Sequence, residues 1–330
     1  MKKNIAVVWG GYSSEKEVSE KSARGIYSFI DGSKYNVYKV KIDSKEWVAE
    51  YNDEYLAIDK NNFSFSNKDI NIRFDFAYIT IHGTPGEDGL LQGYFDMLGI
   101  PYSNCGVLAS ALTFDKFICN NYLKSFGFNV AESIVLRAGD KYDAEEIIEK
   151  LNLPLFVKPN SGGSSFATTK VKEKSQLEAA ISEAFAEASN VIIESFISGT
   201  ELTCGLYEGA KGLQYLPLTE VVTENEFFDY NAKYKGEVDE ITPARISADL
   251  TLEIQRMTER IYRLVDAKGI IRADYIVSDN VPMLLEVNTT PGMTDTSFIP
   301  QQIAAAGLNI MEVMTDIIEY EYAKKAILNK

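Results

Sequence analysis

The chain has 330 residues, of which 45% are hydrophobic and 25% charged, as in ordinary globular proteins. This length predicts two or three domains. The formal net charge of -15 at pH 7 excludes a broad basic face, so neither nucleic acid nor an anionic membrane surface is an expected partner.

The residue inventory narrows the chemistry further. No apolar run reaches the roughly 18 residues of a membrane-spanning helix, and the apolar start is broken at Gly10-Gly11, too early for an export segment. The three cysteines show no metal or disulfide spacing, which favours a reducing cytoplasm. The single histidine, His82, excludes a zinc site with several histidine ligands. Chemistry must therefore depend on carboxylates, Lys, Arg, Tyr, Ser and a hard cation.

The N-terminal segment predicts a strand followed by a helix. Asn4 to Trp9 is a short apolar run that ends at a glycine pair. Ser14 and Glu17 have the spacing of a capping box, which predicts a helix from that point to about Phe29.

Two further strands are predicted at Val37–Ile42 and Phe74–Ile81. Strands that end in Gly-rich turns and lead into helices are typical of a Rossmann-like domain, which we expect up to about Asn104. The Asn- and Ser-rich stretch Asn61–Asn71 predicts a surface loop.

Helices and strands alternate in the middle of the chain, and longer helices follow. The predicted elements are a helical region from Val107, strands at Ser133–Leu136, Leu155–Lys158, Thr168–Val171 and Val191–Glu194, and helices at Ala144–Lys150, Ser175–Ala188, Ala248–Lys268 and Asn309–Lys324. We expect three domains, at residues 1–104, 105–194 and 195–330.

Two predicted strands joined by a turn centred on Asn280 carry a cluster of polar residues. This pairing places Asp274 opposite Glu286 and Arg272 opposite Asn288, all on one face because side chains alternate along a strand. The other face would carry Ile271, Ala273, Leu285 and Val287. Oxygen ligands from Asp, Glu and Asn suit Mg²⁺. A solvated polar strand face is the alternative interpretation.

Two further segments are suited to a nucleotide. A strand ends at Lys158 and a loop rich in Ser and Gly follows at Ser161–Ser165, whose backbone N–H groups could surround phosphates; an ordinary hairpin turn is the alternative. A later strand ends at Glu194, with Phe196 and Ile197 after it. That carboxylate could hold a ribose beside an apolar adenine pocket, although ordinary strand sequence has the same pattern.

In this order, the features resemble the ATP-grasp superfamily, and five motifs resemble its D-alanine–D-alanine ligase family. The motifs are Gly10-Gly11 with Ser13 to Ser19, His82 to Gly89, Asp115-Lys116, Tyr230 to Tyr234, and Glu286 to Thr294. The match covers nearly the whole chain. It implies an α/β fold of the α+β ATP-grasp kind, in which a Rossmann-like N-terminal domain is followed by two α+β domains that clasp ATP.

The resemblance implies an ATP and metal site. It assigns ATP to Lys116, Lys158, Gly163, Ser164, Ser165, Glu194, Phe196, Ile197, Glu201 and Lys233. It assigns two Mg²⁺ ions, with Mn²⁺ as an alternative, to Asp274, Glu286 and Asn288, with Glu286 bridging them.

It also implies an amino-acid site. Glu15 would hold the ammonium of the first D-alanine, supported by Ser164 and Tyr234, and Arg272 with the Gly292 N–H would hold the reacting carboxylate. Residues implied in catalysis are Glu15, Ser164, Tyr234, Arg272, Gly292 and Ser297, and those in substrate binding are Glu15, His82, Glu87, Arg272, Gly292, Ser297 and Phe298. For His82, a strand-end hydrogen bond to backbone is an equal alternative.

The implied activity is ATP-dependent ligation of two D-alanines through an acyl phosphate for peptidoglycan precursors, by a cytoplasmic homodimer. Ser195, Ala167 and Phe298 depart from the Lys, Gly and Leu common in the family. Tyr234, where ligases that use D-lactate place His, favours the dipeptide. Thr223–Asp239 is expected to be a lid. The alternatives are another carboxylate–amine ligase, using D-serine or D-lactate, and a nucleotide-binding module without catalysis.

Overall fold

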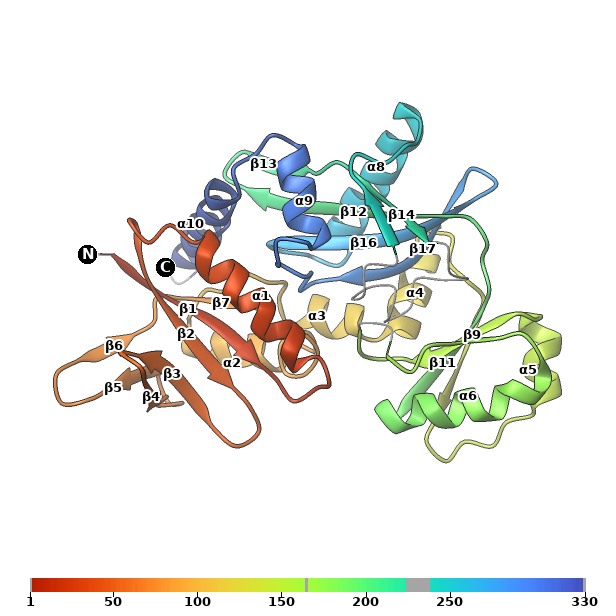
Figure 1. Cartoon of the computed structure of the whole chain (residues 1–330), viewed down its shortest axis with the longest axis horizontal. Helices are drawn as coiled ribbons and strands as arrows, with labels where there is room; N and C mark the ends of the chain where they lie inside the picture. The colour runs from red at the N-terminus through yellow and green to blue at the C-terminus, as the bar shows by residue number, and fades with distance from the viewer. Residues whose placement is uncertain (1, 164–165, 224–237, 329–330) are drawn as a thin grey trace.

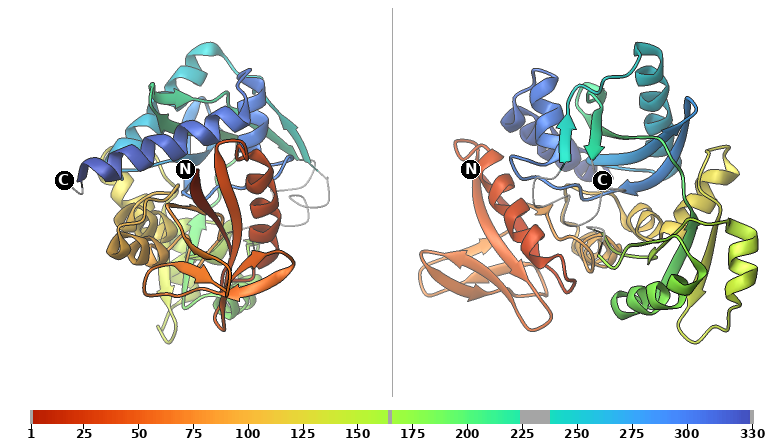
Figure 2. Two further views of the ribbon diagram at one scale, coloured as in Figure 1. Left: turned by 90° about the vertical axis from the view of Figure 1, so that its left-hand side faces the viewer. Right: turned by 45° about the vertical axis from the view of Figure 1, so that its right-hand side comes forward.

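Three sheets and the helices packed against them make up the computed structural model, which describes residues 2–163, 166–223 and 238–328. In Figure 1 the third sheet lies above, and the first and second sheets lie below it on opposite sides. The second view in Figure 2 shows the same arrangement. Within those ranges, no helix has the length and apolar character needed to span a membrane.

The first sheet has the strand order β4-β3-β2-β1-β7. Its strands are β1 (Lys3–Gly10), β2 (Tyr35–Ile42), β3 (Trp47–Tyr51), β4 (Glu54–Ala57) and β7 (Phe76–Ile79). β1 pairs in parallel with β2 and β7, and helix α1 (Lys16–Phe29) connects β1 to β2. This is the strand–turn–helix unit that the sequence predicts.

Both faces of this sheet are buried because its side chains alternate between them. Ile5, Val7 and Trp9 share a core with α1 and with α10 (Ile310–Leu328), the last helix of the chain. Ala6 and Val8 face a second core with α2 (Leu90–Leu98). Figure 2 shows α10 running beside the N-terminal strands.

Two local predictions for this region are wrong. No side chain caps α1, which starts at Lys16 with Glu15 in the N-cap position; the Glu15 N–H contacts the Ser13 hydroxyl at 3.3 Å. Ser13 in turn donates to the His82 carbonyl at 2.9 Å, so a tertiary contact sets this turn. The expected loop at Asn61–Asn71 contains strand β5 (Ser64–Ser66), which pairs with β6 (Asn71–Arg73), because buried Phe63 and Phe65 anchor it among aromatic rings.

The second sheet is antiparallel, in the order β10-β9-β11-β8. Its strands are β8 (Ser133–Arg137), β9 (Leu155–Pro159), β10 (Thr169–Val171) and β11 (Asn190–Ser195), and helices α5 (Ala144–Leu151) and α6 (Lys174–Glu187) pack on it. Each of these elements lies within a residue or two of its predicted bounds.

The third sheet follows the order β15-β14-β12-β16-β17, with β13 beside β12. Its strands are β12 (Thr200–Gly209), β13 (Gly212–Tyr215), β14 (Thr219–Thr223), β15 (Val238–Ile241), β16 (Ile270–Ser278) and β17 (Val281–Asn288). One core joins it to α3 (Val107–Phe114), α4 (Lys116–Ser125) and α8 (Ala248–Leu264). Helix α9 (Phe298–Ala305) follows β17. The three domain boundaries stay a prediction.

Candidate active site

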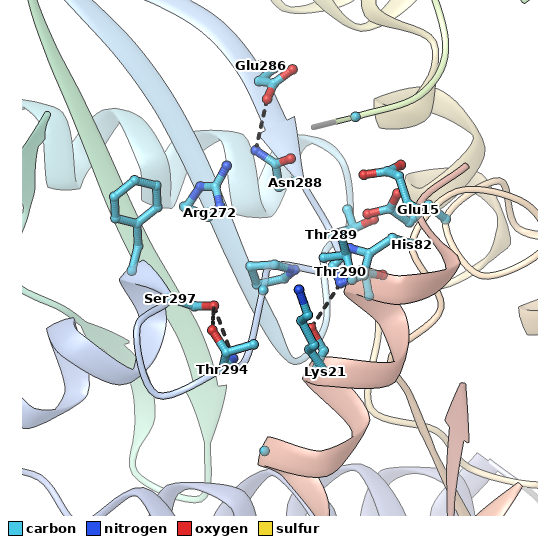
Figure 3. A pocket seen from close by; sticks show the side chains of 18 of the residues that line it. Glu15, Lys21, His82, Arg272, Glu286, Asn288, Thr289, Thr290, Thr294 and Ser297 are labelled. Atoms are coloured by element: carbon cyan, nitrogen blue, oxygen red, sulfur yellow. Dashed lines mark hydrogen bonds between the residues drawn. The ribbon is translucent and has the colours of Figure 1, made fainter. Parts of the chain in front are cut away.

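Two cavities of about 670 and 970 Å³ lie where the three sheets meet, in the size range of small-molecule sites. The first cavity runs along α1 and the loop after β17, and Figure 3 shows it from close by. The second cavity lies between β9, β11 and the third sheet. The residues that line both are Glu15, Phe114, Lys116, Gly162, Gly163, Arg272, Glu286 and Phe298.

The β16–β17 hairpin carries the predicted polar cluster in the predicted register. Asp274 pairs with Glu286 and Arg272 with Asn288. The turn itself is tighter than expected, because Asp279 and Asn280 both have positive φ. A bulge next to Tyr275 restores the register and leaves Leu285 as the extra residue. Leu285 therefore lines the second cavity, which corrects its predicted place on the apolar face.

Arg272 and Asp274 form a fork of two parallel hydrogen bonds. Arg272 Nε donates to Asp274 Oδ1 at 2.8 Å, and Nη2 donates to Oδ2 at 2.7 Å. Burial alone would lower the pKa of Arg272, but the charge and hydrogen bonds of Asp274, together with the charges of Glu286 and Glu201, raise it. The guanidinium is therefore a fixed positive charge between the two cavities.

Glu286 lies where the cavities meet. One carboxylate oxygen is 3.6 Å from Lys116 Nζ, and the other accepts from the Asn288 amide at 3.5 Å. Asn288 also donates to Asp274 at 3.0 Å. Figure 3 shows Glu286, Asn288 and Arg272 on neighbouring strands along one edge of the first cavity. Their oxygen atoms are hard donors of the kind that Mg²⁺ prefers.

An ion pair and two aromatic rings mark the second cavity. Lys158 Nζ is 2.6 Å from Glu194 Oε2. Burial alone would lower the pKa of Lys158, but the charges of Glu194 and Glu286 raise it, so the ammonium persists. The Phe196 and Phe156 rings pack against each other, with their centroids 5.9 Å apart.

The predicted loop after β9 joins the two cavities. Lys116 Nζ donates to the Gly162 carbonyl at 2.5 Å. A Cβ on Gly163 would lie 2.9 Å from Glu15 Oε1, so the loop backbone passes close to that carboxylate, which would have to shift to admit a side chain at this position. Ser164 and Ser165 lie outside the described residues.

Glu15, Glu87 and His82 form the acidic end of the first cavity. Glu15 is only 4% exposed. Glu87 accepts a hydrogen bond from the Gly83 N–H at 2.7 Å. Burial, together with the Glu15 charge, raises the pKa of Glu87 to about 8. The His82 ring is hydrogen-bonded to the Ser22 hydroxyl at 3.2 Å, and it lines the first cavity.

The raised pKa of Glu87 predicts a pH-dependent stability in the metal-free, substrate-free enzyme. A carboxyl that prefers its neutral form when folded loses its favourable contribution as pH rises from 4.5 through about 8. We expect the melting temperature of the wild type to fall relative to that of Glu87→Gln as pH rises through this range, by roughly 2 °C or more. Parallel melting curves at pH 5 to 9 would show that Glu87 ionises normally.

The loop after β17 forms the opposite wall of the first cavity. Ser297 is bonded to Thr294 through both the N–H and the hydroxyl of Thr294, at 3.0 and 2.8 Å. Asn104 donates to the Thr290 hydroxyl at 2.7 Å, and this bond links the loop to the segment just before α3. Gly292 lies beside Ser297, because a Cβ there would be 2.9 Å from the Ser297 hydroxyl.

Helix α1 lies so close to this loop that Gly25 tolerates no side chain. A Cβ at Gly25 would lie 2.1 Å from the Met293 carbonyl oxygen. We expect Gly25→Ala to lower the free energy of unfolding by about 1–3 kcal/mol, as overpacking against fixed backbone does. Urea unfolding measures this. Gly32→Ala, with no atom within 4 Å of its Cβ, is the matched control and should change little.

The structure brings most of the predicted residues into the two cavities. The predicted residues that line them are Glu15, His82, Glu87, Lys116, Lys158, Gly163, Glu194, Phe196, Ile197, Glu201, Arg272, Asp274, Glu286, Asn288, Gly292, Ser297 and Phe298. Lys233, Tyr234 and most of the predicted lid, like Ser164 and Ser165, lie outside the described residues.

Some contacts that support the site residues have no signal in the sequence. Asn120, 2% exposed, reaches Glu194 at 3.5 Å and the Leu285 carbonyl at 3.4 Å. Ser22 is hydrogen-bonded to His82, and Asn104 is hydrogen-bonded to Thr290 in the loop after β17. These are single polar residues in helical or loop sequence, and no local pattern marks them.

Family models match nearly the whole chain. The model described as D-ala D-ala ligase N-terminus matches residues 4–105, and that described as D-ala D-ala ligase C-terminus matches residues 122–319.

Curated relatives are similar over their full length. The chain is 59% identical over 324 residues to a D-alanine–D-alanine ligase of Bacteroides fragilis, which covers 98% of this chain and 100% of the relative. It is 61% identical over 323 residues to that of Parabacteroides distasonis, covering 97% and 98%.

Solved structures share the fold. The VanG D-Ala:D-Ser ligase of Enterococcus faecalis has a TM-score of 0.85 at 32% identity, covering 97% of this chain and 100% of that one. The Bacillus anthracis D-alanine–D-alanine ligase complexed with ATP has a TM-score of 0.79 at 29% identity, covering 99% of both chains.

Proposed function

Because the chain belongs to the D-alanine–D-alanine ligase family, we propose how its two cavities divide the joining of two D-alanines between them. The enzyme is an ATP-dependent ligase that makes D-alanyl-D-alanine for cell-wall synthesis. Its similarity to solved ligases confirms the ATP-grasp fold predicted from the sequence.

One observation carries the division: the two cavities meet at Glu15, Lys116, Arg272 and Glu286. Transfer of a phosphoryl group requires the nucleotide and the accepting carboxylate to approach each other at one point. The second cavity would hold ATP and the first would hold both amino acids. The γ-phosphate would then lie at the junction.

In the second cavity, Lys158 and Lys116 would contact the phosphates, together with the loop at Gly163. Lys158 is paired with Glu194, and Lys116 lies beside Glu286. Phe196 and Ile197 would pack on adenine, and Glu194 and Glu201 would accept from the ribose. The Lys158–Glu194 pair supports this assignment, because a buried, charged pair with a shifted pKa in a cleft is typical of a functional site.

The oxygen atoms of Asp274, Glu286 and Asn288 fit two Mg²⁺ ions, or Mn²⁺ in their place. Asp274 has lone pairs beyond those that accept from Arg272, and Glu286 faces the junction. The Asn288 amide directs its nitrogen at both carboxylates and would turn to present its oxygen. Bound there, the ions would offset the negative charge of the transferring phosphoryl group.

The amino acids would react in two steps. With its ammonium held by Glu15 and Glu87, the first D-alanine would attack the γ-phosphorus through a carboxylate oxygen, releasing ADP and forming an acyl phosphate. The amine of the second D-alanine would then attack the acyl carbon and expel phosphate. Arg272 and the Gly292 N–H would hold the developing oxyanion, since fixed donors aimed at new charge lower its energy.

The second D-alanine would place its carboxylate at the start of α9. The Ser297 hydroxyl and the Phe298 N–H lie there, and Ser297 is fixed by Thr294. His82 would support the first amino acid through its bond to Ser22. The lid at Thr223–Asp239, which would exclude water from the acyl phosphate, stays a prediction, as do the roles of Ser164, Ser165, Lys233 and Tyr234.

Phosphate release from ATP, with the mass of the product, tests the function. We expect release that depends on D-alanine and yields D-alanyl-D-alanine, with L-alanine inactive. D-serine is the informative competitor, because a D-Ala:D-Ser ligase is among the structural neighbours. Mixed products richer in D-serine than in D-alanine, from equal concentrations, would contradict the D-alanine assignment.

A homodimer is the proposed assembly, and exposed apolar side chains on α2 and α3 support it. Met97 is 82% exposed, Leu108 75% and Leu90 64%. Such side chains grouped on adjacent helices mark interfaces. We expect Met97→Lys combined with Leu108→Lys to lower the mass in light scattering toward the 36.9 kDa of one chain. Leu252→Lys, at an exposed site on α8, should leave a dimer intact.

A further inference from the structure

Phe298 contacts Arg272 with its ring. The ring centroid lies 5.2 Å from Arg272 Cζ. Phe298 is 7% exposed and Arg272 is 8% exposed, so the contact is inside the protein, where solvent weakens it least. Phe298 also lines both cavities, which places the ring at their junction.

The Asp274 fork restrains only one edge of the guanidinium. It engages Nε and Nη2, the donors of that edge, and the N–H groups of a guanidinium lie in its plane. Such bonds set where the group points within its plane and resist tilting out of that plane less well. Arg272 Cζ lies over the Phe298 ring, so the ring contacts the guanidinium in addition to the fork. Fork and ring together therefore restrain the group through two different partners.

We propose that the Phe298 ring positions Arg272 for catalysis, by holding the guanidinium so that its remaining N–H groups face the reacting carboxylate. The inference rests on the role proposed above for Arg272. It concerns the ring alone and is separate from the Phe298 backbone N–H at the second amino acid. A guanidinium stacks on an aromatic face, whereas an aliphatic side chain at this position would supply contact without the ring quadrupole.

Removing the Phe298 ring should lower kcat and leave substrate affinity nearly unchanged. In the full-length enzyme, Phe298→Leu keeps an apolar side chain and removes the ring. We expect kcat to fall roughly threefold to thirtyfold, the range of a buried cation–π contact. The KM values for ATP and for both D-alanines should stay within about twofold, because the contact acts when charge develops on the reacting group. Phe298→Tyr keeps the ring face and should restore kcat to within about twofold of the wild type.

A double-mutant cycle locates the effect. In an Arg272→Lys background, Phe298→Leu should lower kcat less than about twofold further, because the planar group that the ring supports is gone. An undiminished loss of kcat in that background would show that the ring acts elsewhere, and the proposal would be wrong. Ile299→Val, a buried change on the same helix outside both cavities, is the control for repacking and should leave kcat unchanged.

The remaining outcomes separate this inference from the function on which it rests. If Phe298→Leu raises only the KM of the second D-alanine, the ring is a wall of that subsite and does not position Arg272. If Arg272→Lys retains wild-type kcat, the role of Arg272 fails and this inference fails with it. If Arg272→Lys is impaired and Phe298→Leu is not, only the inference fails. Should Phe298→Leu fold poorly, as judged by its melting temperature, Phe298→Met replaces it in every arm.

Discussion

Glu286→Gln should lower kcat by roughly a thousandfold while the protein stays folded. The substitution keeps the size of the side chain and its contact with Asn288, but it removes a negative charge from the junction of the two cavities. A neutral amide binds divalent cations weakly. The transferring phosphoryl group would therefore lose the positive charge of the cation that Glu286 would hold. Loss of one such electrostatic contact costs about 10²–10³ in kcat.

Phosphate release across a magnesium titration measures this effect. The variant should stay slow even at high Mg²⁺, because the missing ligand limits the transition state and not only ion affinity. Glu149→Gln, an exposed carboxylate on α5, is the control and should behave as wild type. A Glu286→Gln enzyme with wild-type turnover would remove the metal assignment altogether.

Arg272→Lys is expected to lower kcat by roughly a hundredfold, although it preserves the charge. Lysine cannot form the two parallel hydrogen bonds that Asp274 receives at 2.8 and 2.7 Å, so the cation would be placed without a fixed orientation. It would leave Asp274 partly unpaired in a buried site, with a further cost in stability.

Steady-state kinetics with saturating ATP would show the loss in kcat, with the KM of the first D-alanine changed much less. A large loss in kcat with a small change in KM is the signature of an interaction made in the transition state. The exposed Arg263→Lys on α8, where the arginine is paired with Glu259, offers the same chemical change away from the site. Equal effects at both positions would mean that Arg272 has only a structural role.

The sequence predicted the hairpin cluster because strand alternation and turn position are local properties. The pairs Asp274–Glu286 and Arg272–Asn288 follow from counting residues outward from the turn. The count was right for these pairs although a bulge intervenes. Leu285 was misplaced because of that bulge. A tighter turn and a compensating bulge leave the sequence pattern unchanged, but they move the Leu285 side chain to the other face.

Contacts between distant segments could not be predicted in this way. The Gly25–Met293 approach, the Asn104–Thr290 bond and the Asn120–Glu194 contact join residues 74 to 268 positions apart. No periodicity or spacing connects such residues, because their proximity depends on how the sheets are placed against one another. The family resemblance supplied the order of the site residues, whereas these supports become visible only in three dimensions.

The packing of α10 against β1 has a consequence for biosynthesis. Met314 and Ile317 fill the same core as Ile5 and Val7, the Tyr78 hydroxyl contacts the Met314 sulfur at 3.3 Å, and Lys3 pairs with Glu319 at 2.6 Å. A ribosome delivers β1 about 300 residues before α10. During translation, one face of the nascent first sheet therefore remains uncovered, and it closes only after α10 has been synthesised and has left the exit tunnel.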